Sequence, residues 1–123
     1  MKFIARYLEP SIGTVTANML FADPETNPDE PAVLLFSRTV EFENTAYYFE
    51  INDQSNSSYG GLEEVRLARN TVHIRVAPPV VAKFGDEDFA EVHVTFEADA
   101  ELYAEILKTM RVIFANANIL VIE

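Results

Sequence analysis

Apolar and polar residues alternate along several short segments of the chain, which is the pattern of β-strands with one buried face and one solvated face. The segments with this alternation are residues 2–8, 14–22, 32–42, 46–52, 63–76 and 90–96. Residues 118–122 are also apolar, and they form either a final strand or an extended tail packed on a sheet. The pattern therefore predicts a protein built mainly from strands.

Residues 63–76 predict a hairpin with a defined register. A two-residue turn at Arg69–Asn70 brings apolar residues together on one face and sets acids against bases on the other. The cross-strand pairs in this register are Leu67–Val72, Val65–Ile74, Arg66–His73 and Glu64–Arg75. A slip of one residue would lose both sets of pairs, so this register is the predicted one.

Two segments carry helix signals. Pro78 and Pro79 favour the start of a short helix, and Gly85 favours its end. Residues 99–115 have apolar residues at helical spacing, and Asp99 suits the N-cap position. The predicted apolar side is Leu102, Ile106, Leu107, Met110, Ile113 and Phe114, and the polar side is Glu105, Lys108, Thr109 and Arg111.

These elements predict an α+β fold in a single domain that spans residues 1–123. We expect one mainly antiparallel sheet of about six to seven strands. The short helix and the C-terminal amphipathic helix are expected to pack on one face of this sheet. The other face is then polar and solvated.

A polar segment, NDQSNSSYGG at residues 52–61, separates the tyrosine-containing strand from the hairpin. It predicts a connection between them. We expect Gly60 and Gly61 to form a structural turn, with positive φ or a close backbone approach. If Tyr47 faces the core, the alternation places Tyr48 on the open face of the sheet.

The net charge of −11 is unevenly distributed along the chain. Residues 7–65 hold eleven acids and one base, Arg38. An acidic field of this kind repels nucleic acid and attracts cationic partners. We therefore expect no nucleic-acid partner.

The chain has no cysteine, which excludes disulfides and thiolate catalysis and fits a reducing compartment. The first residues include Arg6 and Glu9 and lack the uninterrupted apolar stretch of a secretory signal. No segment is long enough to span a bilayer. The expectation is a cytoplasmic protein without membrane contact.

Serine side chains offer no recognisable nucleophile. Ser55, Ser57 and Ser58 lack the G-x-S-x-G turn, and no base is placed beside them by the local sequence. We expect no catalytic residue and no cofactor.

Two histidines, His73 and His93, fall on the polar faces of strands that are candidates for neighbours. A metal site would need a third ligand, such as Glu91 or Glu64. Two histidines without a recognised spacing favour solvated side chains on a wet sheet face over a metal site.

The segment YYFEINDQSNSSYGGLEEVRLARNTVHIRV, residues 47–76, resembles the middle of immunity protein family ten of bacterial polymorphic toxin systems. The resemblance rests on an aromatic strand ending in YFEIND, a polar turn, YGG and the hairpin that follows. The preceding LLFSR, residues 34–38, and the downstream order of short helix, strand and amphipathic helix agree with it. The similar region covers about residues 32–115.

This resemblance implies an α+β protein that binds a cognate toxin and neutralises it stoichiometrically, without being an enzyme. An acidic surface would suit a cationic toxin. The residues expected to contact the toxin are Tyr48, Glu50, Asp53, Tyr59, Glu63 and Glu64. The alternatives are an interaction module with another partner and a metal-assisted enzyme that uses His73 and His93. Exposed strand edges also allow a homodimer.

Overall fold

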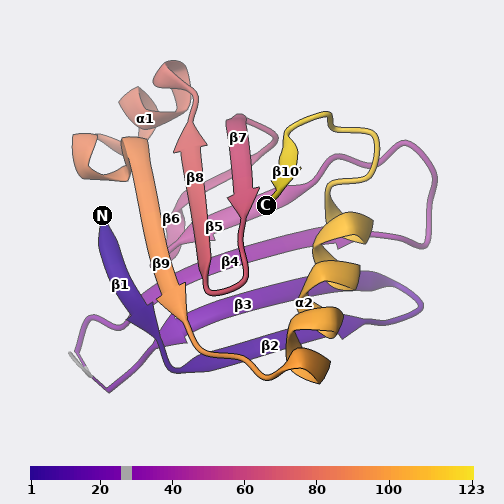
Figure 1. The fold of residues 1–123 in the computed structure, drawn as a ribbon. Coiled ribbons are helices and arrows are strands. Elements are labelled where there is room, and N and C mark those ends of the chain that lie inside the picture. The colour runs from indigo at the N-terminus through magenta and orange to yellow at the C-terminus, as the bar shows by residue number, and fades with distance from the viewer. Residues whose placement is uncertain (26–28) are drawn as a thin grey trace.

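A computed structural model describes residues 1–25 and 29–123 of the chain (Figure 1). The described residues form two five-stranded sheets. The first, which we call the meander sheet, is antiparallel throughout and follows chain order. Its strands are β2 (Tyr7–Ile12), β3 (Thr16–Asp23), β4 (Ala32–Thr39), β5 (Tyr48–Ile51) and β6 (Asp53–Tyr59).

The second sheet, which we call the mixed sheet, has the order β1-β9-β8-β7-β10. Its edge strands β1 and β10 run parallel to β9 and β7, respectively, and the central pairs are antiparallel. Its strands are β1 (Lys2–Ala5), β9 (Glu91–Phe96), β8 (Thr71–Val76), β7 (Leu62–Leu67) and β10 (Leu120–Ile122). The apolar residues 118–122 therefore end in a true strand.

The predicted hairpin register is confirmed in β7 and β8. All four predicted cross-strand pairs are found, and the Ala68 N–H donates to the Thr71 carbonyl (2.9 Å) across the turn. Asn70 lies in this turn and its Nδ2 donates to the Phe96 carbonyl (3.2 Å), which ties the turn to the end of β9.

The prediction of a single sheet is wrong. The predicted strand at residues 2–8 breaks at Arg6, so that β1 joins the mixed sheet and β2 begins the meander sheet. The strands of one sheet run across those of the other, and the two inner faces bury each other (Figure 1). The alternation of apolar and polar residues predicts which side chains are buried. It does not predict whether a helix or a second sheet covers them.

The polar segment 52–61 is also more than a connection, because most of it forms β6. This strand pairs with β5 as an edge of the meander sheet, after a tight turn at Asn52 (φ 68°). None of its residues is fully buried, which explains why the hydrophobic pattern did not predict a strand.

The core between the sheets is rich in aromatic side chains. Phe21, Phe36 and Phe49 of the meander sheet are fully buried, and the Phe21 ring lies 5.4 Å from that of Phe96 in β9. The facing mixed sheet contributes β-branched and leucine side chains, including Val65 and Ile74. Removing this apolar surface from water is the main source of the stability of the fold.

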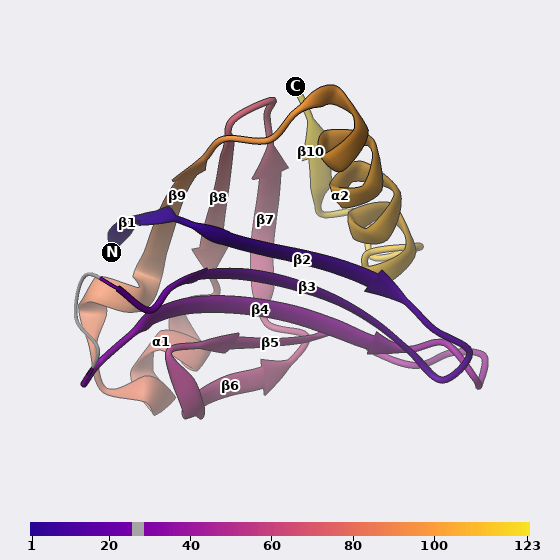
Figure 2. The same ribbon diagram turned by 90° about the horizontal axis from the view of Figure 1, so that it is seen from below.

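The helices lie at opposite ends of the space between the sheets, not together on one sheet face (Figures 1 and 2). They are α1 (Pro78–Phe84), the 3₁₀ helix η1 (Glu87–Ala90) and α2 (Ala100–Ile113). Helix α2 packs on the inner face of the meander sheet, beside the mixed sheet, and α1 contacts β6. Within residues 1–25 and 29–123, no helix has the length and apolar character needed to cross a membrane.

The helix ends follow the sequence signals. Gly85 ends α1 in the left-handed conformation (φ 74°), and the Asp99 side chain caps α2 by accepting from the Leu102 N–H (2.8 Å). The assignment of Thr109 to the polar side of α2 is wrong, because its side chain is 1% exposed. Its hydroxyl donates to the Glu105 carbonyl (2.8 Å), which satisfies the polar group inside the core.

Candidate functional site

The outer face of the meander sheet carries three of the predicted contact residues, Tyr48, Glu50 and Tyr59. Phe49 and Ile51 of β5 are buried, so the alternating Tyr48 and Glu50 point outward. The register sets Tyr48 opposite Tyr59 of β6 and continues Glu50 through Leu35 and Leu20 to Glu9. We call this outer face, made of Glu9, Leu20, Leu35, Tyr48, Glu50 and Tyr59, the tyrosine face.

Tyr48 and Tyr59 form a packed pair on the tyrosine face. Their ring centroids lie 5.0 Å apart, and the Tyr48 hydroxyl donates to the Glu50 carboxylate. Burial, and then this hydrogen bond, raise the pKa of Tyr48 above its ordinary value, which favours the protonated hydroxyl that donates to Glu50. Tyr59 is 76% exposed, and therefore presents most of its ring to solvent on a support fixed by its neighbour.

Tyr47 has the opposite role. Its ring lies 5.1 Å from that of Phe114, and its hydroxyl accepts from the Leu62 N–H (2.9 Å). Burial raises the pKa of Tyr47. The inward Tyr47 and outward Tyr48 confirm the alternation expected for this strand.

The one base of residues 7–65, Arg38, is turned away from the tyrosine face. It lies two residues after the buried Phe36 in β4, so the two side chains are on the same, inner face of the sheet. The Arg38 Nη1 donates to the carbonyls of Ile113 (3.1 Å) and Ala115 (2.6 Å). A cation there satisfies carbonyls at the C-terminal end of α2. The carboxylates of the tyrosine face are thus left without a base from their own strands.

An apolar tip adjoins the meander sheet at the β2–β3 turn and the β4–β5 connection. The N–H groups of Val40 and Glu41 donate to the Val15 carbonyl (2.7 and 3.3 Å), which holds the two loops together. Ile12, Val15 and Phe42 are exposed here, Phe42 by 67%. We call these three residues the apolar tip. The strand pattern did not predict it, although large apolar residues flanking the turn at Gly13 were a visible signal.

The remaining predicted contact residues do not join the tyrosine face. Asp53 is exposed at the β5–β6 turn, where the hydroxyl and the N–H of Ser55 donate to it and lower its pKa. Glu63 is exposed at a bulge in β7. Glu64 lies on the outer face of the mixed sheet and pairs with Arg66 (2.9 Å). The two glutamates therefore belong to the other sheet.

Gly60 and Gly61 carry the chain from β6 in the meander sheet to β7 in the mixed sheet. Both have positive φ, 69° and 89°. A Cβ on Gly61 would lie 2.7 Å from Cγ2 of Val80 in α1, whereas one on Gly60 would have no atom within 4 Å. Gly61 is therefore the crowded position of the two.

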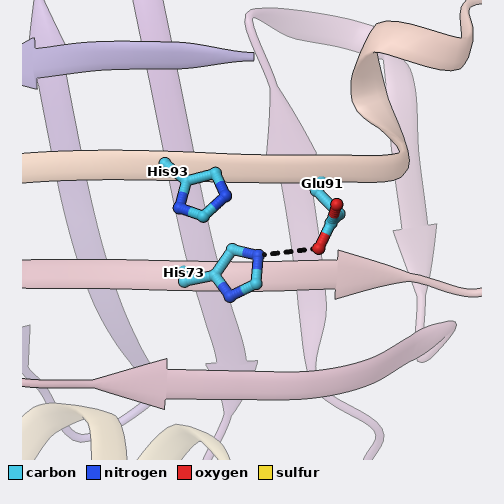
Figure 3. Close-up of side chains that lie close together, drawn as sticks. All are labelled: His73, Glu91 and His93. Carbon is cyan, nitrogen blue, oxygen red and sulfur yellow. Dashed lines mark hydrogen bonds and ion pairs between the residues drawn. The ribbon is translucent and has the colours of Figure 1, made fainter.

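The outer face of the mixed sheet brings the two histidines together (Figure 3). His73 of β8 and His93 of β9 are directly opposite in the register, and their rings stack at 3.9 Å with an interplanar angle of 12°. His73 Nε2 lies 3.1 Å from a carboxylate oxygen of Glu91. Burial, followed by the charges of His73 and Lys2, lowers the pKa of His93.

The serines lie far from this imidazole pair in the fold. Ser55, Ser57 and Ser58 are in β6 of the meander sheet, and both histidines are in the mixed sheet. The hydroxyls of Ser57 and Ser58 donate to carbonyls within β6. Among the described residues, no serine hydroxyl is hydrogen-bonded to a histidine.

Comparison with known proteins identifies one family. The model of the family described as Immunity protein 10 matches residues 18–104, from β3 into α2. No curated protein and no solved structure matches the chain. The matched region is well over half of the chain and includes β3–β6, which carry most of the tyrosine face.

Proposed function

Because the chain belongs to the immunity protein 10 family, we propose that it binds a cognate bacterial toxin and neutralises it as a stoichiometric inhibitor. The family match confirms the resemblance drawn from residues 47–76. It also makes a toxin protein the natural partner. In this proposal the protein acts in the cytoplasm by covering the toxin and contributes no catalytic step of its own.

The tyrosine face is the surface that we propose for this contact. Tyrosine supplies rigid contact area at low cost in side-chain entropy, and it is enriched among the residues that dominate binding energy. Tyr59 presents a largely exposed ring against Tyr48, with the partly buried Leu20 and Leu35 in the adjoining strands. This packed aromatic pair on an open sheet face is the observation that carries the proposal.

The charge of the tyrosine face favours a cationic surface on the toxin. Glu9 and Glu50 form no ion pair among the described residues, and Arg38 is occupied at the end of α2. Acids without local bases produce a field that accelerates the approach of a positively charged partner.

The apolar tip lies beside the tyrosine face and not on it, because Ile12 pairs with the buried Ala17 and so has the inward side-chain direction. Ile12 ends β2 and Phe42 follows β4, so both lie at one end of the strands that carry the tyrosine face. An exposed apolar group rimmed by acids, here Glu41 and Glu43, is typical of a protein-binding surface. We include the tip in the proposed contact.

The decisive experiment expresses the protein together with the toxin genes encoded beside its own. We expect protection from one toxin and recovery of a one-to-one complex with it. Failure to bind or protect against any neighbouring toxin would contradict toxin neutralisation.

Charge reversal tests which face is used. Glu50→Lys should lose protection, whereas Glu97→Lys, an exposed acid just after β9, should retain it. Equal protection by both variants would exclude the tyrosine face while leaving the partner class intact.

A further inference from the structure

The histidine pair and Glu91 form a cluster that the proposed toxin contact does not use. It lies on the outer face of the mixed sheet, and the tyrosine face is the outer face of the meander sheet. We propose that His73, Glu91 and His93 form a binding site for a divalent transition-metal ion such as Zn²⁺.

The donor atoms of the cluster are already close. One donor atom from each of the three side chains lies within 4.8 Å of the others, and His73 Nε2 is 3.1 Å from a Glu91 oxygen. Bonds of roughly 2.1 Å to a tetrahedral metal require donor atoms roughly 3.4 Å apart. The stacked rings must therefore rotate out of their parallel arrangement so that their nitrogen lone pairs converge.

The site can make this adjustment without moving the backbone. Glu91 and His93 are exposed and sit two residues apart on the same face of β9, so their side chains are unhindered on the solvent side. Underneath, Val92 and Val94 are fully buried and fix the strand. Side chains carried on a packed sheet give a more precise metal site than side chains on a loop.

The donor set selects the class of metal. Two imidazoles and one carboxylate suit Zn²⁺, Cu²⁺ or Ni²⁺, whereas Mg²⁺ and Ca²⁺ prefer oxygen ligands alone. Three protein ligands leave a coordination position for water or for a group from another molecule.

Neighbouring cations set a limit on the affinity. Lys2 is the register partner of His93, and Arg75 is the register partner of Glu91. Both place positive charge beside the proposed ion, so we expect dissociation constants well above those of buried structural zinc sites. Lys2→Gln should tighten binding several-fold because it removes one repelling charge.

The test uses tag-free protein, because the chain has only two histidines and no cysteine of its own. Titration with ZnCl₂ is followed by calorimetry and by thermal unfolding, and Co²⁺ absorption reports the ligand geometry. We expect one ion per chain and a rise in Tm of about 10 °C when the free Zn²⁺ concentration is about a hundred times Kd. MgCl₂ should cause no comparable rise.

Variants assign the response to the cluster. His73→Gln, His93→Gln and Glu91→Gln should each weaken Zn²⁺ binding by about ten-fold or more. Glu97→Gln serves as the matched control and should leave it unchanged. The proposal is overturned if Zn²⁺ does not bind the wild-type protein, or if Glu91→Gln and both histidine variants respond as the wild type does. Since Glu91 is exposed, its variant keeps the test valid even if a histidine variant fails to fold.

Discussion

The outer faces of the two sheets differ in how their charged side chains are paired. On the mixed sheet, acids and bases are paired within the face: Arg66 pairs with Glu64 (2.9 Å) and with Glu123 (2.5 Å). On the tyrosine face, Glu9 and Glu50 lie among tyrosine and leucine side chains, and Arg38 is turned inward. A face that pairs its own acids and bases has little charge left to attract a protein, whereas one that leaves acids beside an exposed aromatic ring is suited to binding a cationic protein.

The largest effect is expected where the chain passes between the two sheets. Gly61→Val would place a Cβ 2.7 Å from Val80 Cγ2 at a φ of 89°, so we expect a loss of about 4 kcal/mol in the free energy of unfolding. Gly60→Val shares the positive φ but meets no atom, and should lose about 2 kcal/mol. Denaturant unfolding measures both.

Ser57→Ala in the same region is the mild control and should change stability by less than about 0.5 kcal/mol. Equal midpoints for the two glycine variants would show that crowding against α1 does not matter. Equal midpoints for Gly60→Val and Ser57→Ala would contradict the role of positive φ.

The change of sheet at Gly60–Gly61 explains why only part of the candidate site could be predicted from the sequence. Alternation placed Tyr48 on the open face correctly. Tyr47 points inward, and successive side chains of a strand point to opposite faces of the sheet. The predicted contact surface also included Glu64, because Glu64 and Tyr48 lie in the same acidic segment of the sequence. Between these two residues the chain passes from the meander sheet to the mixed sheet. The alternation of apolar and polar residues does not indicate which sheet a strand joins.

In the fold as well, pairings between neighbouring segments could be predicted from the sequence, and pairings between distant segments could not. The β7–β8 register was predictable because both of its faces constrain it and its turn is local. The pairing of Lys2 with His93 was not, because it joins parallel strands from distant parts of the chain. Strand β6 was missed because none of its polar residues is fully buried, and its pairing with β5 holds it in place.

Removing the exposed tyrosine tests the tyrosine face most directly. Tyr59→Ala should weaken toxin binding about thirty-fold or more, about 2 kcal/mol, because a central aromatic anchor is lost. Tyr103→Ala is the matched control, since that ring packs under Arg69 (4.8 Å) on another surface. Calorimetric titration of the toxin measures both. Unchanged affinity for Tyr59→Ala, in protein with wild-type Tm, would move the contact elsewhere.

Substitution of Arg38 tests whether any base offsets the negative charges of the tyrosine face. Arg38→Met should lower the free energy of unfolding by about 1.5 kcal/mol, because two helix-end carbonyls lose a charged donor. Arg111→Met removes a charge in the last turn of the same helix and should cost less. If Arg38 is turned inward, its loss leaves the rate of toxin association unchanged. A clear rise in that rate would show that it had been compensating the acids.

The smallest effect is expected at the outer acid of the tyrosine face. Glu9→Lys should slow association with a cationic toxin about three- to ten-fold at low salt, with little change in the dissociation rate, because a peripheral charge acts on approach. The difference should shrink as ionic strength rises and screens the exposed charge. Stopped-flow measurement at two salt concentrations, with Glu97→Lys as the control, separates steering from contact. If both reversals slow association equally, the effect belongs to the net charge of −11 and not to the tyrosine face.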